Sequence, residues 1–232
     1  MLYRIILVVM LACAGLAHAQ NKAVELYQQA KTQAAAGELD AALQSLQQSA
    51  AAGFLGLQFL RKEEAFDALR SDDRFASILL QVRKNLYPCE EGEHFADFDF
   101  WVGSWDVFTG DGNKAGSNVI SRVENGCALQ ELWTSAGGTT GRSLNFYDPN
   151  RGKWRQHWVS PTGLLIDIEG GLVDGSMVLE GIVYYFSGLQ ADFRGTWTPL
   201  EDGRVRQYFE QHDAASDSWQ PWFEGFYVRT GE

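Results

Sequence analysis

Residues 98–107 read FDFWVGSWDV, and this aromatic stretch decides how the chain is divided. Before it, apolar residues recur with the spacing of helices. After it, they alternate with polar residues, and turn signals follow one another at short intervals. The stretch therefore marks the start of a β-rich domain. Gly103, two residues before Trp105, predicts a close backbone approach or a bend where the first strand begins.

Ten β-rich runs follow, separated by turn sequences such as DPNRGK (148–153) and SPTG (160–163). Short strands with turns every 8–12 residues or so indicate an antiparallel sandwich or an up-and-down barrel, and we expect a barrel of about 10 strands. No helix-length pattern interrupts the runs, which argues against a βαβ fold. The strands are expected over residues 105–109, 118–123, 128–135, 141–147, 154–159, 164–169, 177–186, 189–198, 204–212 and 219–229.

Residues 20–86 are expected to form a helical domain, so that the whole chain belongs to the α+β class. Gly37 is placed to end the first helix, and residues 71–73 (SDD) suit the N-cap of the last one. A polar segment, residues 87–96, is expected to link this domain to a barrel domain over 97–232. The apolar stripes of the three main helices are Ala23, Leu26, Tyr27, Ala30 and Ala34; Leu39, Ala42, Leu43, Leu46 and Ala50; and Phe75, Ile78, Leu79, Val82 and Leu86.

The first residues, 1–19, have the features of a secretory signal peptide. A single arginine precedes an apolar run, and small residues stand at Ala17 and Ala19, which predicts cleavage after Ala19. The alternative is a lipoprotein signal that ends at Cys13. No other segment is long and apolar enough to cross a bilayer. The expected location is therefore periplasmic or secreted, with no membrane insertion of the mature chain.

The net charge limits the classes of partner, and the cysteine content predicts a disulfide. The net charge of −11 argues against nucleic acid and against anionic membrane surfaces, both of which require basic patches. Cys89 and Cys127 are the two cysteines beyond the signal segment. An even pair in an oxidising compartment favours a disulfide over two unrelated buried thiols.

The helix pair over residues 23–50, AVELYQQAKTQAAAGELDAALQSLQQSA, resembles a tetratricopeptide repeat. Small residues occur where the two helices approach, and Gly-Glu-Leu-Asp occupies the turn. The resemblance covers one repeat and a degenerate second unit, whereas a solenoid normally needs about three repeats to be stable alone. It implies either structural support or recognition of a protein partner through the helical domain.

Gly103-Ser104-Trp105 at the start of the first strand, together with Arg229 in the last one, resembles the lipocalins and the wider calycin group. The resemblance implies that Trp105 closes one end of the barrel and that Arg229 stacks on it, a contact worth on the order of 1–2 kcal/mol. The runs FDFWVGSW, NGCALQELW, GRSLNFYDP and TWTPLEDGRVRQ belong to a second resemblance. Nearly all of residues 98–229 resembles a family of exported bacterial domains without assigned function, thought to form lipocalin-like barrels. That family supplies no catalytic residues. The start sequence of nitrobindin-type haem barrels is missing, and no cofactor is predicted.

Strand alternation sorts side chains into two faces without showing which face is inside. On the fifth expected strand, Trp154, Gln156 and Trp158 share one face. On the fourth, residues 143, 145 and 147 likewise lie together on one face. The strand at 204–212 carries a polar stripe of alternate residues. A tryptophan-lined interior with a few polar groups suits a mostly apolar ligand with a polar head. The candidate ligand-binding residues are Trp101, Asn145, Tyr147, Gln156, Trp158, Arg206 and Glu210.

Three hypotheses about function follow. The first is an exported, non-enzymatic protein whose barrel holds a small, mostly apolar molecule. The second is an enzyme whose acid or base lies at the barrel mouth, with Glu131 or Glu210 as the carboxylate and Gln156 or Tyr147 beside it. The third is an interaction module that uses the helical domain. No catalytic residue is assigned, and the histidine spacing does not predict a metal site.

Overall fold

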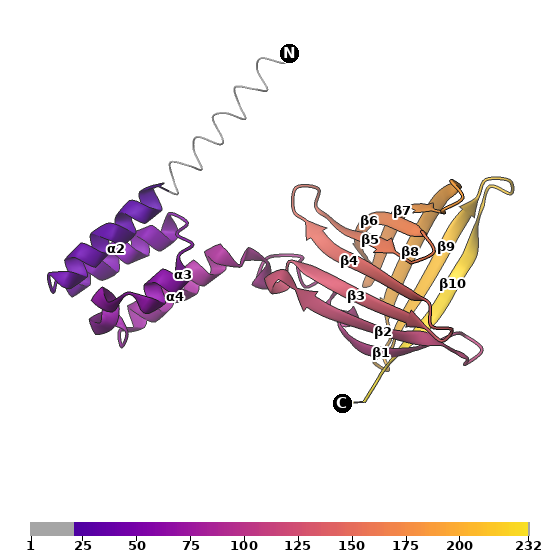
Figure 1. The fold of residues 1–232 in the computed structure, drawn as a ribbon, viewed down its shortest axis with the longest axis horizontal. Helices are drawn as coiled ribbons and strands as arrows, with labels where there is room; N and C mark the ends of the chain where they lie inside the picture. The colour runs from indigo at the N-terminus through magenta and orange to yellow at the C-terminus, as the bar shows by residue number, and fades with distance from the viewer. Residues whose placement is uncertain (1–20, 232) are drawn as a thin grey trace, which may run out of the picture. The chain divides into compact units, whose positions relative to one another are not determined.

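The computed structural model of the chain describes residues 21–231, and the expected signal peptide lies outside them. These residues form two compact units that divide between Pro88 and Cys89. The first unit is helical, and the second contains all the strands (Figure 1). The predicted order of N-terminal helices followed by an antiparallel barrel is confirmed.

The first helix that the structure describes covers residues 21–35, and the turn after it contains Gly37. Gly37 has a φ of 80°, which favours glycine, and its N–H donates to the carbonyl of Ala34. At the other end of the unit, the Asp72 side chain caps the last helix by accepting a hydrogen bond from the N–H of Arg74. The further elements are α2 (Leu39–Ala51), α3 (Leu57–Lys62), the 3-10 helix η1 (Glu64–Leu69) and α4 (Asp73–Leu86).

Most residues of the predicted apolar stripes pack against one another and form a core within the unit, whereas Leu39, at the start of α2, is 37% exposed. Two polar contacts tie the ends of the helices together. Ser49 Oγ donates to the carbonyl of Ala23 at 2.7 Å, and Asn85 Nδ2 donates to the carbonyl of Ala50 at 2.7 Å. Among the residues described, no helix has the length and apolar character needed to cross a membrane.

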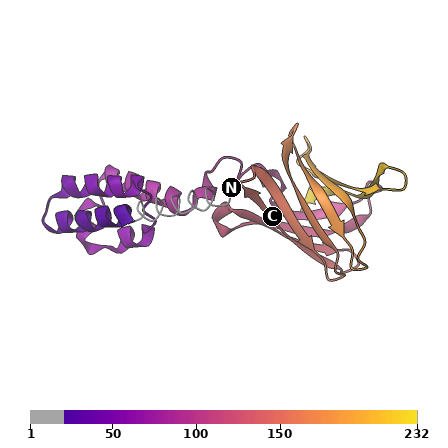
Figure 2. The ribbon, with the colours of Figure 1, turned by 90° about the horizontal axis from the view of Figure 1, so that it is seen from above.

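The barrel unit contains ten antiparallel strands that close in the order β1-β10-β9-β8-β7-β6-β5-β4-β3-β2 (Figure 1). The pairing of β1 with β10 makes the sheet a barrel and excludes the sandwich. Figure 2 shows the strands wrapping around one interior. The strands are β1 (Gly103–Phe108), β2 (Lys114–Val123), β3 (Ala128–Ser135), β4 (Thr140–Asp148), β5 (Lys153–Val159), β6 (Leu165–Val173), β7 (Ser176–Tyr184), β8 (Gln190–Pro199), β9 (Val205–Asp213) and β10 (Ser218–Arg229).

The first and last strands meet at Trp105 and Arg229, which are direct partners in the β1–β10 register. The guanidinium carbon of Arg229 lies 4.3 Å from the centroid of the buried Trp105 ring, and Nη1 donates to the carbonyl of Val102 at 3.2 Å. Gly103 has a φ of 147°, and a Cβ there would come 2.5 Å from Arg229 Nη1. The glycine therefore makes room for the arginine that covers this seam.

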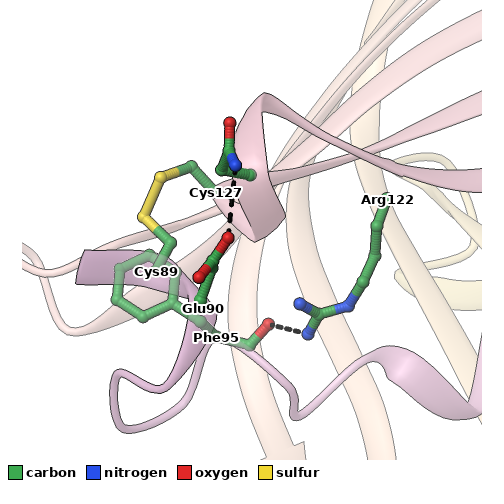
Figure 3. Close-up of a disulfide and its surroundings, with 6 residues drawn as sticks. Cys89, Glu90, Phe95, Arg122 and Cys127 are labelled. Atoms are coloured by element: carbon green, nitrogen blue, oxygen red, sulfur yellow. Dashed lines mark hydrogen bonds between the residues drawn. A yellow bond between two sulfur atoms is a disulfide. The ribbon is translucent and has the colours of Figure 1, made fainter. Parts of the chain in front are cut away.

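Residues 89–101, part of which the sequence assigns to a linker, belong to the barrel unit. The Cys89–Cys127 disulfide attaches them to the turn before β3 (Figure 3). Arg122 on β2 donates to the Asp99 carboxylate at 2.7 Å and to the carbonyl of Phe95 at 3.1 Å. Three 3-10 turns shape this region, η2 (Pro88–Glu90), η3 (Asp99–Trp101) and η4 (Glu124–Gly126).

This attachment places an aromatic cluster inside one part of the barrel. Phe98 and Trp101 stack with ring centroids 4.9 Å apart, and Trp101 lies 5.5 Å from Trp197. Trp105 and Trp154 complete the cluster, and all five side chains are buried. Trp101 was expected to contact a ligand, but it stands in η3, before the first strand, and belongs to this packed cluster.

Candidate functional site

Beyond the aromatic cluster, the barrel contains an interior cavity of about 90 Å³. Five strands supply its walls: β3, β5, β6, β9 and β10. Six of its side chains are aromatic, and the polar ones are a carboxylate and an amide. The lining residues are Glu131, Trp133, Trp158, Ile166, Gln207, Phe209, Trp222, Phe223 and Tyr227. We call this space the interior cavity.

Glu131 on β3 brings a carboxyl group to the wall of the interior cavity, with 4% of the residue exposed. Each of its oxygens accepts a hydrogen bond from an uncharged donor. Asn118 Nδ2 on β2 donates to Oε1 at 2.7 Å, and Ser143 Oγ on β4 donates to Oε2 at 2.6 Å. Antiparallel pairing explains the arrangement, because Glu131 is opposite Ser143 on β4, and Asn118 lies two residues from Ile120, the residue opposite Glu131 on β2, and so on the same face. The acid is therefore fixed between two neighbouring strands.

The hydrogen bonds continue on both sides of Glu131. On one side, Asn145 Nδ2 donates to Ser143 Oγ at 2.8 Å, and Gln156 Nε2 donates to Asn145 Oδ1 at 2.7 Å. This part joins β4 to β5 through buried side chains. Asn145 and Gln156, both predicted ligand contacts, thus lie behind the acid and hold the position of its Ser143 donor.

On the other side of the acid, Asn118 also donates to the Tyr227 hydroxyl at 3.1 Å. Tyr227 in turn donates to Gln207 Oε1 at 2.7 Å. Both hydrogens of the Asn118 amide are therefore used, while its buried Oδ1 has no hydrogen-bond partner. An unpaired buried acceptor costs on the order of 1–3 kcal/mol. The network is thus arranged to donate hydrogen bonds to Glu131, even at the expense of one unsatisfied oxygen.

The electrostatics of the interior cavity follow from this burial. Removal from water raises the pKa of Glu131 above its ordinary value of 4.5, while the hydrogen bonds from Ser143 and Asn118 oppose the shift. Burial, and then the nearby charge of Glu131, raise the pKa of Tyr227 well above 10. In the part of the chain that the structure describes, no cationic side chain forms an ion pair with Glu131, and no cluster of three potential metal ligands occurs.

The tryptophan walls lie against glycines of neighbouring strands. At Gly141 on β4, a Cβ would come 2.2 Å from Cζ2 of the Trp158 ring. At Gly116 on β2, a Cβ would come 2.7 Å from the Trp133 ring. Because these positions lack side chains, the two rings lie close to the sheet and leave the centre of the barrel open.

Trp222 stands at the mouth of the interior cavity and is 39% exposed. It follows Pro221, where the β9–β10 register shifts, and its indole N–H donates to the Tyr185 hydroxyl at 3.2 Å. Tyr185 donates in turn to Gln211. Trp222 also lines an open hollow of about 700 Å³ along the rim of β7–β10. The side chain thus separates this rim hollow from the interior cavity.

The prediction that Arg206 and Glu210 line the interior is wrong. Both project from the outer face of β9, where Arg206 pairs with Glu224 at 2.7 Å and Glu210 pairs with Arg194 at 2.9 Å. The inward positions of this strand are Val205, Gln207, Phe209 and Gln211. Two apolar side chains share that face, and their burial outweighs the polar stripe on the other face. Glu210 therefore does not line the interior cavity.

Tyr147 on β4 and Trp158 on β5 both lie on the inward face of their strand, but they line different spaces. Trp158 lines the interior cavity. Tyr147 lies beside His94 and Phe95 and lines a separate outer hollow of about 380 Å³. Tyr147 therefore stands apart from Glu131, and of the proposed polar partners only Gln156 belongs to the network around that acid.

Several residues around the interior cavity were not predicted from the sequence. Strand alternation could have identified most of them, because these residues share a strand face with apolar residues and are therefore expected to point inward. Tyr227 alternates with Gly225 and Phe223, and Gln207 lies between Val205 and Phe209. The unpredicted side chains are Asn118, Trp133, Gln207, Phe209, Trp222, Phe223 and Tyr227.

Comparisons with known proteins do not assign a family. No protein-family model matches the chain, and no curated protein matches it. The resemblances to calycins and to tetratricopeptide repeats therefore stay predictions from the sequence. Most apolar residues of the helices pack in the core of their own unit. Recognition of a protein partner by that unit also stays a prediction.

Proposed function

We propose that the barrel binds a small, mostly apolar molecule with a polar head in its interior cavity. The observation that carries the proposal is the cavity itself, in which aromatic walls surround one fixed carboxyl group. Ligand sites combine these features, because the apolar walls contribute affinity and a few oriented polar groups contribute specificity. The packed aromatic cluster around Trp101 restricts the ligand to the part of the barrel that opens past Trp222.

The volume of the cavity limits the size of the ligand. Drug-sized pockets have volumes of about 300–1,000 Å³, whereas one water needs at least about 10–15 Å³. A cavity of about 90 Å³ lies between these limits and suits a molecule with a few non-hydrogen atoms. Such a ligand would place its polar head at Glu131 and its apolar part against Phe223 and Trp222.

Our proposal includes export of the protein to the periplasm or the medium. The signal-like sequence of residues 1–19 supports it, and so does the Cys89–Cys127 disulfide, because disulfides persist in oxidising compartments. Mass determination of the protein from the native host tests this point. A mature chain that begins at Gln20 would support export, and a chain that retains residues 1–19 would contradict it.

The binding test uses 1-butanol as a probe, with tryptophan fluorescence as the readout, because Trp133, Trp158 and Trp222 line the cavity. The test variant is Gly141→Ala, whose methyl group would push the Trp158 ring into the cavity. Gly137→Ala is the matched control, since a Cβ at that turn would meet nothing closer than 3.8 Å. Native mass spectrometry of the purified protein looks in parallel for a small molecule that copurifies.

We expect saturable binding of 1-butanol to the unmodified protein and to Gly137→Ala, and binding at least about tenfold weaker to Gly141→Ala. Equal binding to all three proteins would show that the probe binds elsewhere. Absence of binding to the unmodified protein, with no copurifying molecule, would refute the proposed function.

A second candidate function is acid–base catalysis by Glu131. The observation in its favour is that this strand carboxylate is buried beside a cavity, and that burial raises its pKa above the ordinary value of 4.5. In such a reaction, the Glu131 carboxylate would take a proton from a carbon next to a carbonyl group and return a solvent-derived proton to it.

Exchange of the α-protons of 2-butanone in D₂O, followed by NMR, tests this candidate. Catalysed exchange that is lost in Glu131→Gln and kept in Glu180→Gln would support it. Glu180 is an acid on the outer face of β7, with 60% of its side chain exposed. An exchange rate equal to that of buffer alone would reject this reaction class for the ketone.

A further inference from the structure

The hydrogen bonds around Glu131 suit an ionised carboxylate. A carboxylate can only accept hydrogen bonds, and here both oxygens accept from neutral groups, Asn118 and Ser143. The amide of Asn118 directs its hydrogens to Glu131 and Tyr227 and leaves its own oxygen unpaired. The protein supplies donors for a negative charge but no positive group to balance it, among the residues described.

The rest of the interior cavity supplies surfaces that attract cations. Trp133, Trp158, Trp222, Phe209, Phe223 and Tyr227 all line it. A cation within about 6 Å of the centroid of an aromatic ring is stabilised by the negative face of that ring. The aromatic walls and the acid therefore favour the same charge on a ligand.

We infer that the polar head of the ligand is a cation, and that the interior cavity takes a small protonated amine whose ammonium group binds Glu131 while its alkyl part contacts the aromatic walls. This inference rests on the proposed function and specifies its ligand class. The ammonium group would donate to carboxylate lone pairs that Asn118 and Ser143 leave free, because a carboxylate has about four acceptor sites.

Neutral and anionic ligands fit this site less well. A neutral alcohol could donate one hydrogen bond to Glu131, but it would bring no charge to stabilise the ionised form of the acid. An anion would place a like charge beside the carboxylate of Glu131. A protonated amine alone provides both the donor and the compensating charge.

Release of a proton on binding is a measurable result that distinguishes a cationic ligand from a neutral one. The titratable side chains that line the cavity are Glu131 and Tyr227, and the groups that contact Glu131 from β2 and β4 are the uncharged Asn118 and Ser143. Burial favours the protonated acid in the empty protein. A bound cation favours the carboxylate, so binding near pH 5, close to the ordinary pKa of 4.5, releases up to one proton from Glu131 to the buffer.

The test compares n-butylammonium, 1-butanol and propionate, which have equal numbers of non-hydrogen atoms and differ in charge. Isothermal titration near neutral pH measures their binding to the unmodified protein, to Glu131→Gln and to the outer-face control Glu180→Gln. Titration of the unmodified protein with n-butylammonium is repeated near pH 5 in two buffers with different ionisation enthalpies, which counts the protons released.

We expect n-butylammonium to bind the unmodified protein at least about tenfold more tightly than 1-butanol does, and propionate to bind more weakly than either. Glu131→Gln should remove the preference for the cation and change the affinity for 1-butanol by less than about threefold. Glu180→Gln should leave all three affinities unchanged. The buffer experiment should show proton release by the unmodified protein, so it decides the question even if Glu131→Gln does not fold.

Two results would overturn the inference. Tighter binding of 1-butanol than of n-butylammonium, or a preference for the cation that survives Glu131→Gln, would show that the cavity binds a neutral head, and the proposed function would stand. Heats independent of the buffer would show that Glu131 does not release its proton and would also reject the inference. Binding of none of the three probes would reject the inference and the proposed function together.

Discussion

Replacement of Glu131 by glutamine should change how the stability of the barrel depends on pH. In the folded protein, burial raises the pKa of Glu131 above 4.5, whereas the unfolded chain returns the group to water and to its ordinary value. Between these two values the folded protein holds a proton that the unfolded chain has released. The contribution of this group to stability is therefore fully present below about pH 4.5 and is lost as the pH rises toward the raised pKa.

The magnitude of the effect follows from proton linkage. One extra proton bound by the folded state changes the free energy of unfolding by about 1.4 kcal/mol per pH unit. Glutamine keeps the size of the side chain and an acceptor oxygen but does not titrate. Relative to the unmodified protein, Glu131→Gln should thus gain up to about 1.4 kcal/mol for each pH unit above about 4.5, until the raised pKa is reached.

Urea unfolding followed by tryptophan fluorescence measures this difference in the barrel alone. All 8 tryptophans belong to the barrel unit, so the helical unit does not contribute to the signal. The disulfide is kept oxidised, and curves are recorded between about pH 5 and 8, where most surface carboxylates are already ionised in both states. Subtraction of the two variants at each pH cancels the groups that they share.

Glu180→Gln is the control for this series, because its side chain is largely exposed on the outer face of β7. Its difference from the unmodified protein should vary little with pH. The reasoning would be refuted if Glu131→Gln gave a pH-independent difference, or if the unmodified protein gained stability relative to Glu131→Gln as the pH rises. Either result would mean that the folded barrel does not favour the protonated acid.

Two further predictions concern closure of the barrel and attachment of its N-terminal segment. Arg229→Ala should lower the free energy of unfolding by about 1 kcal/mol in urea titrations, because it removes the cation over Trp105, and an unchanged midpoint would contradict this role. Replacement of Cys89 and Cys127 by serine should cost about 4 kcal/mol by the chain-entropy model for residues 38 apart in sequence, and a loss below about 1 kcal/mol would show that other contacts hold residues 89–101 in place.

The fold could be predicted from the sequence because its signals are local. Each strand is marked by alternation and by the turns around it, whereas the closing contact between Trp105 and Arg229 was implied by the resemblance to the calycins. Alternation and turns depend on a few neighbouring residues, and the strand register then follows from the order of the hairpins. The ten expected strands therefore agree with those observed, apart from shifts at their ends.

The interior cavity was harder to predict, because alternation defines two faces without showing which is inside. On β9 the polar stripe with Arg206 and Glu210 suggested a ligand site, but salt bridges on the outer face account for it. On β3 the reverse holds, since Glu131 is buried although glutamate ordinarily prefers the surface. Its partners Asn118 and Ser143 come from other strands, so that only the closed barrel brings the three together.

The polar network bears on function because stability alone does not require it. Well-packed apolar side chains at buried positions are often as stabilising as paired polar groups, or more so. Here the barrel fills one part of its interior with the aromatic cluster around Trp101, and then places Glu131 and the unpaired Asn118 oxygen beside open space. Burial of the acid and of the unpaired oxygen opposes folding, whereas a ligand that neutralises the acid would recover part of that free energy on binding. The arrangement thus favours a barrel that gains stability when its cavity is occupied.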